Sequence, residues 1–497
     1  MRRGRRRLSL RTKTGYGAVE LGMSAAEVML LFYLLEFYTK VIGLRAELAG
    51  FALALAMIWD AITDPVMGGV SDRTRSRMGK RRPYIILGSV LLAFGIVFIF
   101  SRPDIETQAG KFFYLLGAYM LVNTSMTIVA VPHAALAGEV SFDRNERTEL
   151  FGWRLLFRTF GFMVAVLLPG LLVIYFEERL GVSRTLASRW IGISILATGL
   201  VTFLSVRRID KPAPPLTISL GKLRDRYSRA MMELRGFFRG LQSVATNKAF
   251  VPLLITYILA YIGRTVNTST AIYYYEVRLG LTERQIHINV LGLFTVVICL
   301  SIGAWVFISR RFGKKAPAFW GALGLGLSTI VIYPLLPPGQ VLPPMLLGSV
   351  LGGFLVGSII IFESLVADIV DYDELKTGVQ REGLYFGFWT MSTKFARAVA
   401  LATTGILLRA IGLQEGQLEQ TPETARGLAI LYGPVVGGCF TLAAIAFLFM
   451  PLTDAKHERI QRLLRRRRAL RARHLAATEP PPDVEIEEEP FELPHPL

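Results

Sequence analysis

Long apolar runs separated by short polar clusters make up most of the sequence. About twelve of these runs are each long enough for a membrane-spanning helix of roughly 20 residues. The expected spans cover residues 17–43, 48–71, 84–101, 112–138, 153–175, 186–206, 249–275, 284–309, 316–336, 341–364, 385–411 and 426–451. The pattern predicts an all-α membrane protein with twelve transmembrane helices.

Polar segments divide these spans into two groups of six. We expect a basic N-terminal segment at 1–16, six-helix bundles at 17–206 and 249–451, and a tail at 452–497. The connection 207–248 places apolar residues at helical spacing among arginines, which is typical of an amphipathic helix on a membrane surface. The tail begins with a basic helical pattern and ends in a Pro- and Glu-rich stretch that we expect to be disordered.

Composition and charge agree with a membrane location. The chain is 52% hydrophobic, has a mean hydropathy of +0.44 and carries a net charge of +18. The basic residues gather in alternate connections, whereas the loops between them hold few; the loop with Arg179, Arg184 and Arg189 fits this asymmetry least well. The asymmetry predicts that both termini lie in the cytoplasm of a cell membrane, the inner one in a Gram-negative bacterium. We therefore expect basic clusters to contact anionic lipid and not nucleic acid.

The stretch from Asp60 to Pro83, DAITDPVMGGVSDRTRSRMGKRRP, combines a carboxylate pair with a basic turn. Asp60 and Asp64 are four residues apart, so both side chains project from one face of a helix. A carboxylate at membrane depth is unfavourable unless it faces a polar cavity or meets a cation. The six Lys/Arg residues between Arg73 and Arg82 place this end of the helix in the cytoplasm. We expect a binding site for Na⁺ or H⁺ at the pair.

Enzymatic chemistry is not indicated by the remaining motifs. Both cysteines, Cys299 and Cys439, lie within apolar spans and give neither a disulfide framework nor metal-ligand spacing. No zinc pattern, Ser/His set or nucleotide-binding loop is visible. We expect a non-enzymatic monomer without a cofactor or any metal beyond a possible Na⁺.

A basic, Gly-containing turn follows the second span of each half, SDRTRSRMGKRR and SRRFGKK, as a transporter built from two repeated bundles would show.

Several motifs resemble the glycoside–pentoside–hexuronide:cation symporter family (melibiose-permease-like transporters) of the major facilitator superfamily. The resemblance is strongest at 60–83 and extends to FYTKVIGL (37–44), FDRNERTELFGWR (142–154), ADIVDYDELKTG (367–378) and the Lys in STKFARA (392–398). It implies a twelve-helix bundle that carries out cation-coupled symport of a sugar, glycoside or uronide.

The resemblance also implies roles for individual residues of the coupling site. The cation-binding aspartates of the family match Asp60 and Asp64, and Thr63 replaces a side-chain amide before the second of them. Thr127 matches a family threonine on helix four. Lys394 matches a lysine between the cation and substrate sites, where it pairs with Asp60 when no cation is bound. Hydroxyl and carboxylate oxygens suit Na⁺, but a carboxylate pair alone carries a proton equally well, so both ions remain open.

The substrate positions depart from the family pattern. Ser24 and Ala130 occupy the places where family members that take galactosides have sugar-binding acidic residues. Arg264, near the centre of its span, needs an anion from the protein or from the substrate. Together with Lys394 and Arg397, it makes the expected cavity more positive, so we expect an anionic or amphiphilic substrate: a uronide, an organic acid or a lysolipid-like headgroup.

Two further charged positions have two readings each, and a group in the basic turn has an expected gating role. Glu27 either faces the substrate cavity or pairs with an arginine of a neighbouring helix. Arg154 resembles a family arginine near the cavity, but it also lies close enough to the span end to reach the cytoplasmic surface. The cytoplasmic gate is expected at a group of residues in the basic turn: Asp72, Arg73, Arg77 and Gly79.

The pattern favours a secondary transporter that alternates access by rocking two six-helix halves around a central site. Two alternatives remain: sodium-dependent transport of a lysophospholipid or similar lipid, and a receptor or scaffold that kept the fold without transport. An apolar lateral opening between spans would favour the lipid substrate.

Overall fold

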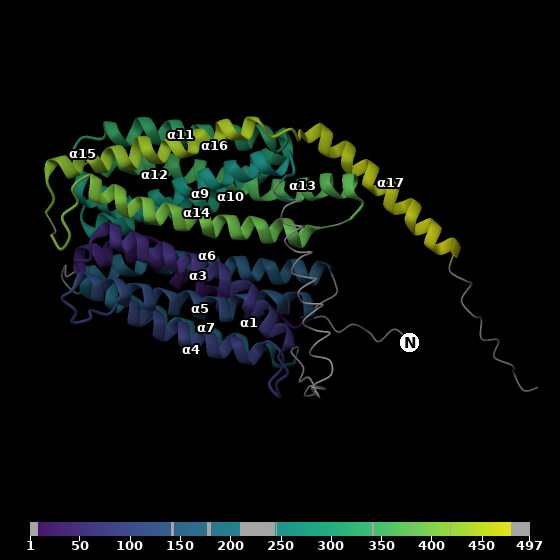
Figure 1. Cartoon of the computed structure of the whole chain (residues 1–497), viewed down its shortest axis with the longest axis horizontal. Coiled ribbons are helices and arrows are strands. Elements are labelled where there is room, and N and C mark those ends of the chain that lie inside the picture. The colour runs from purple at the N-terminus through teal and green to yellow at the C-terminus, as the bar shows by residue number, and fades with distance from the viewer. Residues whose placement is uncertain are drawn as a thin grey trace, which may run out of the picture.

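The computed structural model describes residues 8–140, 144–175, 180–208, 244, 246–339, 342–379, 381–417 and 419–478. Every regular element in these ranges is a helix, as predicted. Figure 1 shows the helices in two layers, the first half of the chain in purple to blue and the second half in teal to yellow. The predicted amphipathic helix in 207–248 and the acidic tail end lie outside the described residues, as do the first residues of the 142–154 motif.

Within the described ranges, the first half contains α1 (Leu10–Gly17), α2 (Val19–Glu36), η1 (Phe37–Val41), α3 (Ala46–Arg73), α4 (Arg82–Ile99), α5 (Gln108–Val140), α6 (Arg144–Tyr175), α7 (Leu180–Ser205) and η2 (Val206–Arg208). The second half contains α9 (Phe250–Tyr273), η3 (Tyr274–Arg278), η4 (Gln285–Gly292), α10 (Leu293–Phe312), α11 (Lys315–Leu335), α12 (Leu342–Val356), η5 (Gly357–Ile359), α13 (Ile360–Thr377), α14 (Glu382–Ala410), α15 (Pro422–Ile430), η6 (Leu431–Val435) and α16 (Val436–Leu448). The tail forms α17 (Asp454–Thr478).

Among the described residues, 11 helical stretches are long and apolar enough to cross a membrane. The twelfth long helix is α14, whose 29 residues exceed the length needed. Lys394 and Arg397 are charged and therefore lower its hydropathy. A membrane span tolerates them because both face the cavity inside the protein and not lipid. α14 packs against α3 and α9, so it belongs to the bundle. Together these stretches match the twelve predicted spans.

The first helix begins earlier than the pattern predicts. It starts at Leu10 instead of near residue 17, and the hydroxyl of Ser9 caps it by accepting a hydrogen bond from the Thr12 amide. Lys13 lies against Glu149 of α6. A cap and an ion pair therefore extend the helix beyond the apolar run, which the hydropathy pattern does not register.

The two ends of the bundle differ in charge. Figure 1 shows α1 and α17 at the same end. The basic turns 74–81 and 310–315 belong to this end too, which we call the basic end. The opposite end contains the connections 42–45, 101–107 and 279–284. That the basic end faces the cytoplasm stays a prediction.

The halves meet most closely where α3 crosses α14. A Cβ added at Gly50 would lie 2.6 Å from the Leu401 carbonyl oxygen, and one added at Gly405 would lie 2.4 Å from the Ala46 carbonyl oxygen. Only glycine permits this approach, as at other tight helix contacts in membranes. The crossing brings α14 beside the middle of α3, where the candidate site lies.

Candidate functional site

A cavity of about 1560 Å³, including the part open to solvent, lies between the two halves. α2, α3, α5 and α6 line it from the first half, and α9, α13 and α14 line it from the second. Its lining extends from the middle of these helices toward the basic end, for example to Asp64 and Phe386. Solute-sized space at the interface of two repeats is the usual position of a transporter's binding site.

Asp60 and Asp64 line this cavity and share one lysine. The Lys394 ammonium lies 2.7 Å from Asp60 Oδ2 and 2.5 Å from Asp64 Oδ2. Two carboxylates a helical turn apart repel each other, and the single ammonium between them relieves that repulsion. The helical spacing of the pair thus gives a shared site for one positive charge.

The Thr127 hydroxyl completes this group from α5. Its Oγ1 lies 3.0 Å from Asp60 Oδ1 and 2.8 Å from Asp64 Oδ1. A hydroxyl has one hydrogen, so it donates to one carboxylate at a time and keeps its lone pairs for a cation. Asp60, Asp64 and Thr127 therefore present only oxygen ligands, of the kind that hard cations prefer.

Thr63 lies apart from this oxygen cluster. Its hydroxyl donates to the carbonyl of Asp60, at 3.1 Å, one turn back along α3. It does not line the cavity, unlike the two aspartates. Its role as a cation ligand remains a prediction that would require rotation of the side chain.

The arginines predicted for the substrate site occupy two different environments. Arg264 and Arg397 line the cavity, and so does Arg158. Glu27 lies between two of them: its carboxylate is 3.3 Å from Arg158 Nη2 and 4.0 Å from Arg397 Nη1. The two alternatives predicted for Glu27 therefore hold together: it faces the cavity and also pairs with arginines of neighbouring helices.

Arg154 points elsewhere. Its guanidinium donates to Glu20 Oε1, at 2.5 Å from Nη2, and His133 Nδ1 lies 3.3 Å from the same oxygen. These partners belong to the first half, and Arg154 does not line the cavity. Arg158, one turn further along the same face, does. Ala130 borders the cavity, and Ser24 borders a neighbouring groove.

Residues that the sequence patterns left unassigned complete the lining. Glu363 of α13 accepts a hydrogen bond from the Tyr257 hydroxyl at 2.7 Å, and the Tyr257 ring stacks on Trp389 with centroids 4.1 Å apart. Asn123 of α5 also lines the cavity. Glu363 lies at the end of an apolar run. As for Asp60, a carboxylate in such a position is unfavourable unless it faces a polar cavity or meets a cation, and this signal in the sequence could have identified it.

Among the described side chains, the predicted gate residues show no contact with the second half. Asp72 pairs with Arg81, at 2.5 Å, within the first half, and Gly79 adopts a positive φ of 108° in the turn. Arg77 is exposed, and the Arg73 side chain lies outside the description. A gating role for the turn therefore stays a prediction.

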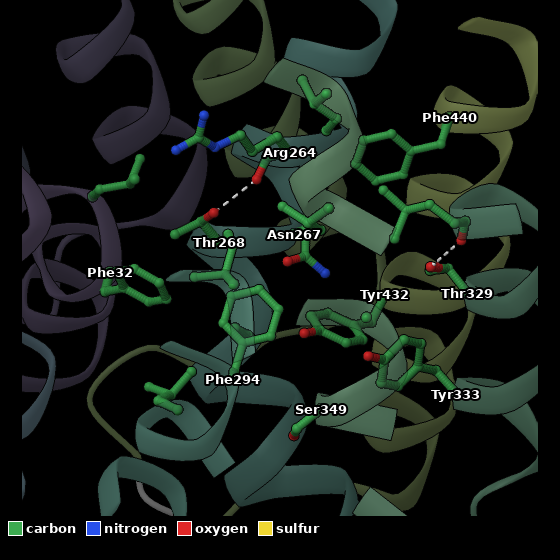
Figure 2. A pocket seen from close by; sticks show the side chains of 18 of the residues that line it. Phe32, Arg264, Asn267, Thr268, Phe294, Thr329, Tyr333, Ser349, Tyr432 and Phe440 are labelled. Atoms are coloured by element: carbon green, nitrogen blue, oxygen red, sulfur yellow. Dashed lines mark hydrogen bonds between the residues drawn. The ribbon is translucent and has the colours of Figure 1, made fainter. Parts of the chain in front are cut away.

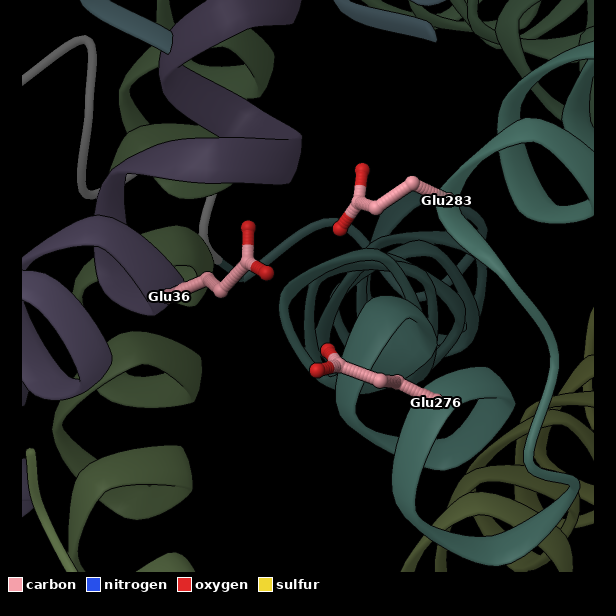
Figure 3. Close-up of side chains that lie close together, drawn as sticks. All are labelled: Glu36, Glu276 and Glu283. Carbon is pink, nitrogen blue, oxygen red and sulfur yellow. The ribbon is translucent and has the colours of Figure 1, made fainter. Parts of the chain in front are cut away.

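Buried charges join the halves at the opposite end instead. This opposite-end cluster consists of Glu36, Lys40, Arg184, Glu276, Glu283 and His287. Arg184 lies 3.3 Å from Glu36 and 3.1 Å from Glu283, and Lys40 pairs with Glu276. Figure 3 shows the carboxylate of Glu36, from the first half, facing those of Glu276 and Glu283 from the second.

The neighbouring charges of the cluster favour the ionised form of the Glu283 carboxyl group. Burial raises the pKa of this carboxyl, but Arg184 and His287 outweigh burial and hold that pKa well below its usual value. The pairing also explains why Arg184 disturbed the charge asymmetry of the loops: its charge is compensated inside the protein. Ion pairs thus join the two halves at the opposite end, which we call the closed end.

Comparisons with known proteins agree with this architecture. The family model described as MFS/sugar transport protein matches residues 15–454. The glucuronide carrier protein homolog of Escherichia coli is 26% identical, over 91% of this chain and 95% of its own. The sodium-dependent lysophosphatidylcholine symporter 1-A of Danio rerio is 23% identical, over 87% of this chain and 85% of its own.

A solved structure confirms the fold. The crystal structure of the nucleoside transporter NupG superposes with a TM-score of 0.61 at 12% identity, covering 89% of this chain and all of NupG. The helical spans and this likeness confirm the predicted fold class, and the family match together with the apolar helices confirms the location in a cell membrane. A protein named as a putative glycoside/cation symporter, YagG of Escherichia coli, is 24% identical over 93% of this chain and 96% of its own. The chain is a multi-pass cell-membrane protein, and it belongs to the MFS/sugar transport family of the major facilitator superfamily.

Proposed function

We propose that the protein is a symporter that couples entry of one cation, Na⁺ or H⁺, to transport of a small anionic organic solute such as a sugar acid or uronide. The observation that carries this proposal is the Lys394 ammonium bound between Asp60 and Asp64 in the central cavity. A lysine at this point holds the place of a cation and is released when a cation arrives.

Coupling follows from competition for the carboxylate pair. A cation that enters is bound by oxygen atoms of Asp60, Asp64 and Thr127. Because it neutralises the carboxylate pair, it weakens the attraction that holds the Lys394 ammonium there. The freed ammonium then adds a positive charge to the open part of the cavity. Because binding of cation and substrate is linked, the substrate anion must in turn tighten cation binding.

The charge of the lining favours an anion as the substrate. Among the described residues, four cationic side chains and four carboxylates line the cavity: Arg158, Arg264, Lys394 and Arg397 against Glu27, Asp60, Asp64 and Glu363. The ionised lining is neutral, so one bound cation leaves a charge of +1. An anionic substrate restores neutrality, and unpaired charge in a poorly solvated site is unfavourable.

A second candidate, transport of a lysophospholipid, is favoured by one specific feature. A groove lined by Leu155, Phe162 and Ile302 lies between α6 and α10 beside Arg264, and Leu155 is 62% exposed. Such a groove would admit an acyl chain from the side of the bundle. The symporter from Danio rerio is named for a lysophosphatidylcholine substrate.

The test is uptake by the purified protein in lipid vesicles, with a library of sugars, uronides, organic acids and lysophospholipids. Each compound is offered with and without an imposed Na⁺ or H⁺ gradient. We expect an anionic compound to accumulate only when one gradient is present. If uptake of every compound ignores both gradients, the proposal fails.

A further inference from the structure

A separate hollow lies next to the central cavity, mainly among helices of the second half and bordered by α2 and α6 of the first half. This aromatic chamber has a cavity volume of about 80 Å³, within about 850 Å³ of space that includes the part open to solvent. Its only charged lining residue among those described, Arg264, also lines the cavity. Figure 2 shows Phe294, Tyr333, Tyr432 and Phe440 around it, with Phe32 of α2 at the side of the first half.

Most of the chamber's hydroxyl groups are already bonded within the protein. Thr268 donates to the Arg264 carbonyl at 2.8 Å, and Thr329 donates to the Leu325 carbonyl at 2.7 Å. Ser349 donates to the Met345 carbonyl, and the hydroxyls of Tyr275 and Tyr432 are 2.7 Å apart. Apart from the Asn267 amide, a group that enters therefore meets mainly aromatic and aliphatic surface, which suits an apolar group better than a polyol.

Arg264 marks the boundary between chamber and cavity. Its backbone belongs to the chamber wall, while Figure 2 shows its guanidinium turned away from Phe440 and Tyr333, toward the first half. No carboxylate among the described residues lies within ion-pair distance of it, whereas Arg158 and Arg397 both approach Glu27. A guanidinium left in this position is suited to a carboxylate or phosphate of a ligand.

We propose that the aromatic chamber is a second subsite, which binds the apolar group of an anionic amphiphile while Arg264 binds its anionic group. The substrate class is narrowed from any small anion to one with an apolar substituent. This inference rests on the proposed function only in taking the cavity as the solute site. Two sources share the chemistry, an aryl uronide and an anionic lysolipid.

Equilibrium binding to the purified protein, without any ion gradient, tests the subsite independently of transport. The ligands are glucuronate, phenyl β-glucuronide, the neutral phenyl β-glucoside and a short-chain lysophosphatidylglycerol. Burial of the phenyl ring should tighten binding of phenyl β-glucuronide about tenfold or more over glucuronate. Arg264→Gln should abolish the preference for the glucuronide over the glucoside.

Chamber-filling variants give the decisive contrast. A Cβ at Gly352 would meet the Tyr333 hydroxyl at 3.5 Å, an ordinary contact, so Gly352→Leu fills the chamber with limited disturbance. We expect Gly352→Leu, and Ser349→Leu as an independent variant, to remove the gain from the phenyl ring and leave glucuronate binding unchanged. Gly303→Leu, on the open face of α10 with nothing within 4 Å, is the matched control and should keep the gain.

The outcomes distinguish between the two ligand classes and also show whether the subsite exists. Chamber-dependent binding of the glucuronide supports the subsite with a soluble glycoside as ligand, and chamber-dependent binding of the lysolipid supports it with a lipid as ligand. The proposal is overturned if neither ligand gains affinity from its apolar group, or if the gain persists in both chamber-filling variants. Loss of gradient-driven uptake with this binding intact would instead refute only the proposed coupling.

Discussion

Thr127 shows how much of the candidate cation site depends on one hydroxyl. It is the only described side chain outside α3 and α14 that bonds both aspartates, and it reaches them from the neighbouring helix α5. Thr63, on the same helix as the pair, instead bonds its own backbone. The structure therefore ranks Thr127 above Thr63 as a cation ligand, a distinction that residue type alone did not provide.

Replacing Thr127 should weaken cation binding selectively. Thr127→Val keeps the shape and removes the oxygen, so we expect about a tenfold higher cation concentration for half-maximal uptake. Thr127→Ser should retain most of the affinity, and Thr63→Val, the matched control on α3, should have a smaller effect. Cation titrations of uptake in vesicles measure all three; an equal loss in Thr63→Val and Thr127→Val would contradict the ranking.

The sequence predicted the residues of the pair better than the residues around it. Spacing along α3 is sufficient to place Asp60 and Asp64 on one face, because a helix fixes that geometry locally. Arg154 and Arg158 share a face in the same way, yet only Arg158 reaches the cavity. The difference arises because Glu20 on α2 binds Arg154, and the crossing of two helices is not contained in the periodicity of either.

At the scale of elements, the crossing of α3 and α14 connects the coupling site to the closed end. One contact between these helices is the Lys394–Asp60 ion pair, and another is the glycine approach near the opposite end. A movement of α14 that follows release of Lys394 would therefore also act on the closed end. Apolar run lengths predicted both helices, but not that they would touch.

Adding bulk at this crossing should impair transport. Gly405→Val places a side chain against the Ala46 carbonyl, so α14 must move away from α3, and we expect uptake to fall several-fold. Gly387→Val, on the same helix with nothing within 4 Å of its Cβ, is the control. Initial uptake rates, normalised to folded protein, make the comparison; similar rates in both variants would show that the close approach is not needed.

For the whole molecule, ion pairs at the opposite end and a cavity that extends toward the basic end are the arrangement expected of one state in the proposed alternating-access cycle. Lys40 and Glu276 belong to different halves, so their pair must break when that end opens. The partners of the opposite-end cluster come from elements far apart in the sequence. Local motifs therefore indicate the basic turn as a gate and do not predict these ion pairs.

Reversing one charge of this pair should open the opposite end. Lys40→Glu places two carboxylates together across the halves, and we expect a cysteine introduced at the buried Ala46 to become several-fold more reactive. The experiment uses a background in which Cys299 and Cys439 are alanine. Lys40→Glu combined with Glu276→Lys should restore protection. Unchanged labelling in the single variant would mean that this pair does not hold the end closed.

Accumulation of substrate against its gradient tests the coupling role of the carboxylate pair most directly. The wild-type protein and Asp60→Asn are reconstituted into vesicles at the same amount of protein per lipid. The internal and external concentrations of a transported solute are then measured under an imposed cation gradient. We expect the wild type to concentrate the solute and Asp60→Asn to lose that accumulation, because the site can no longer exchange Lys394 for the cation. Equal accumulation by both proteins would contradict coupling through Asp60 and Asp64.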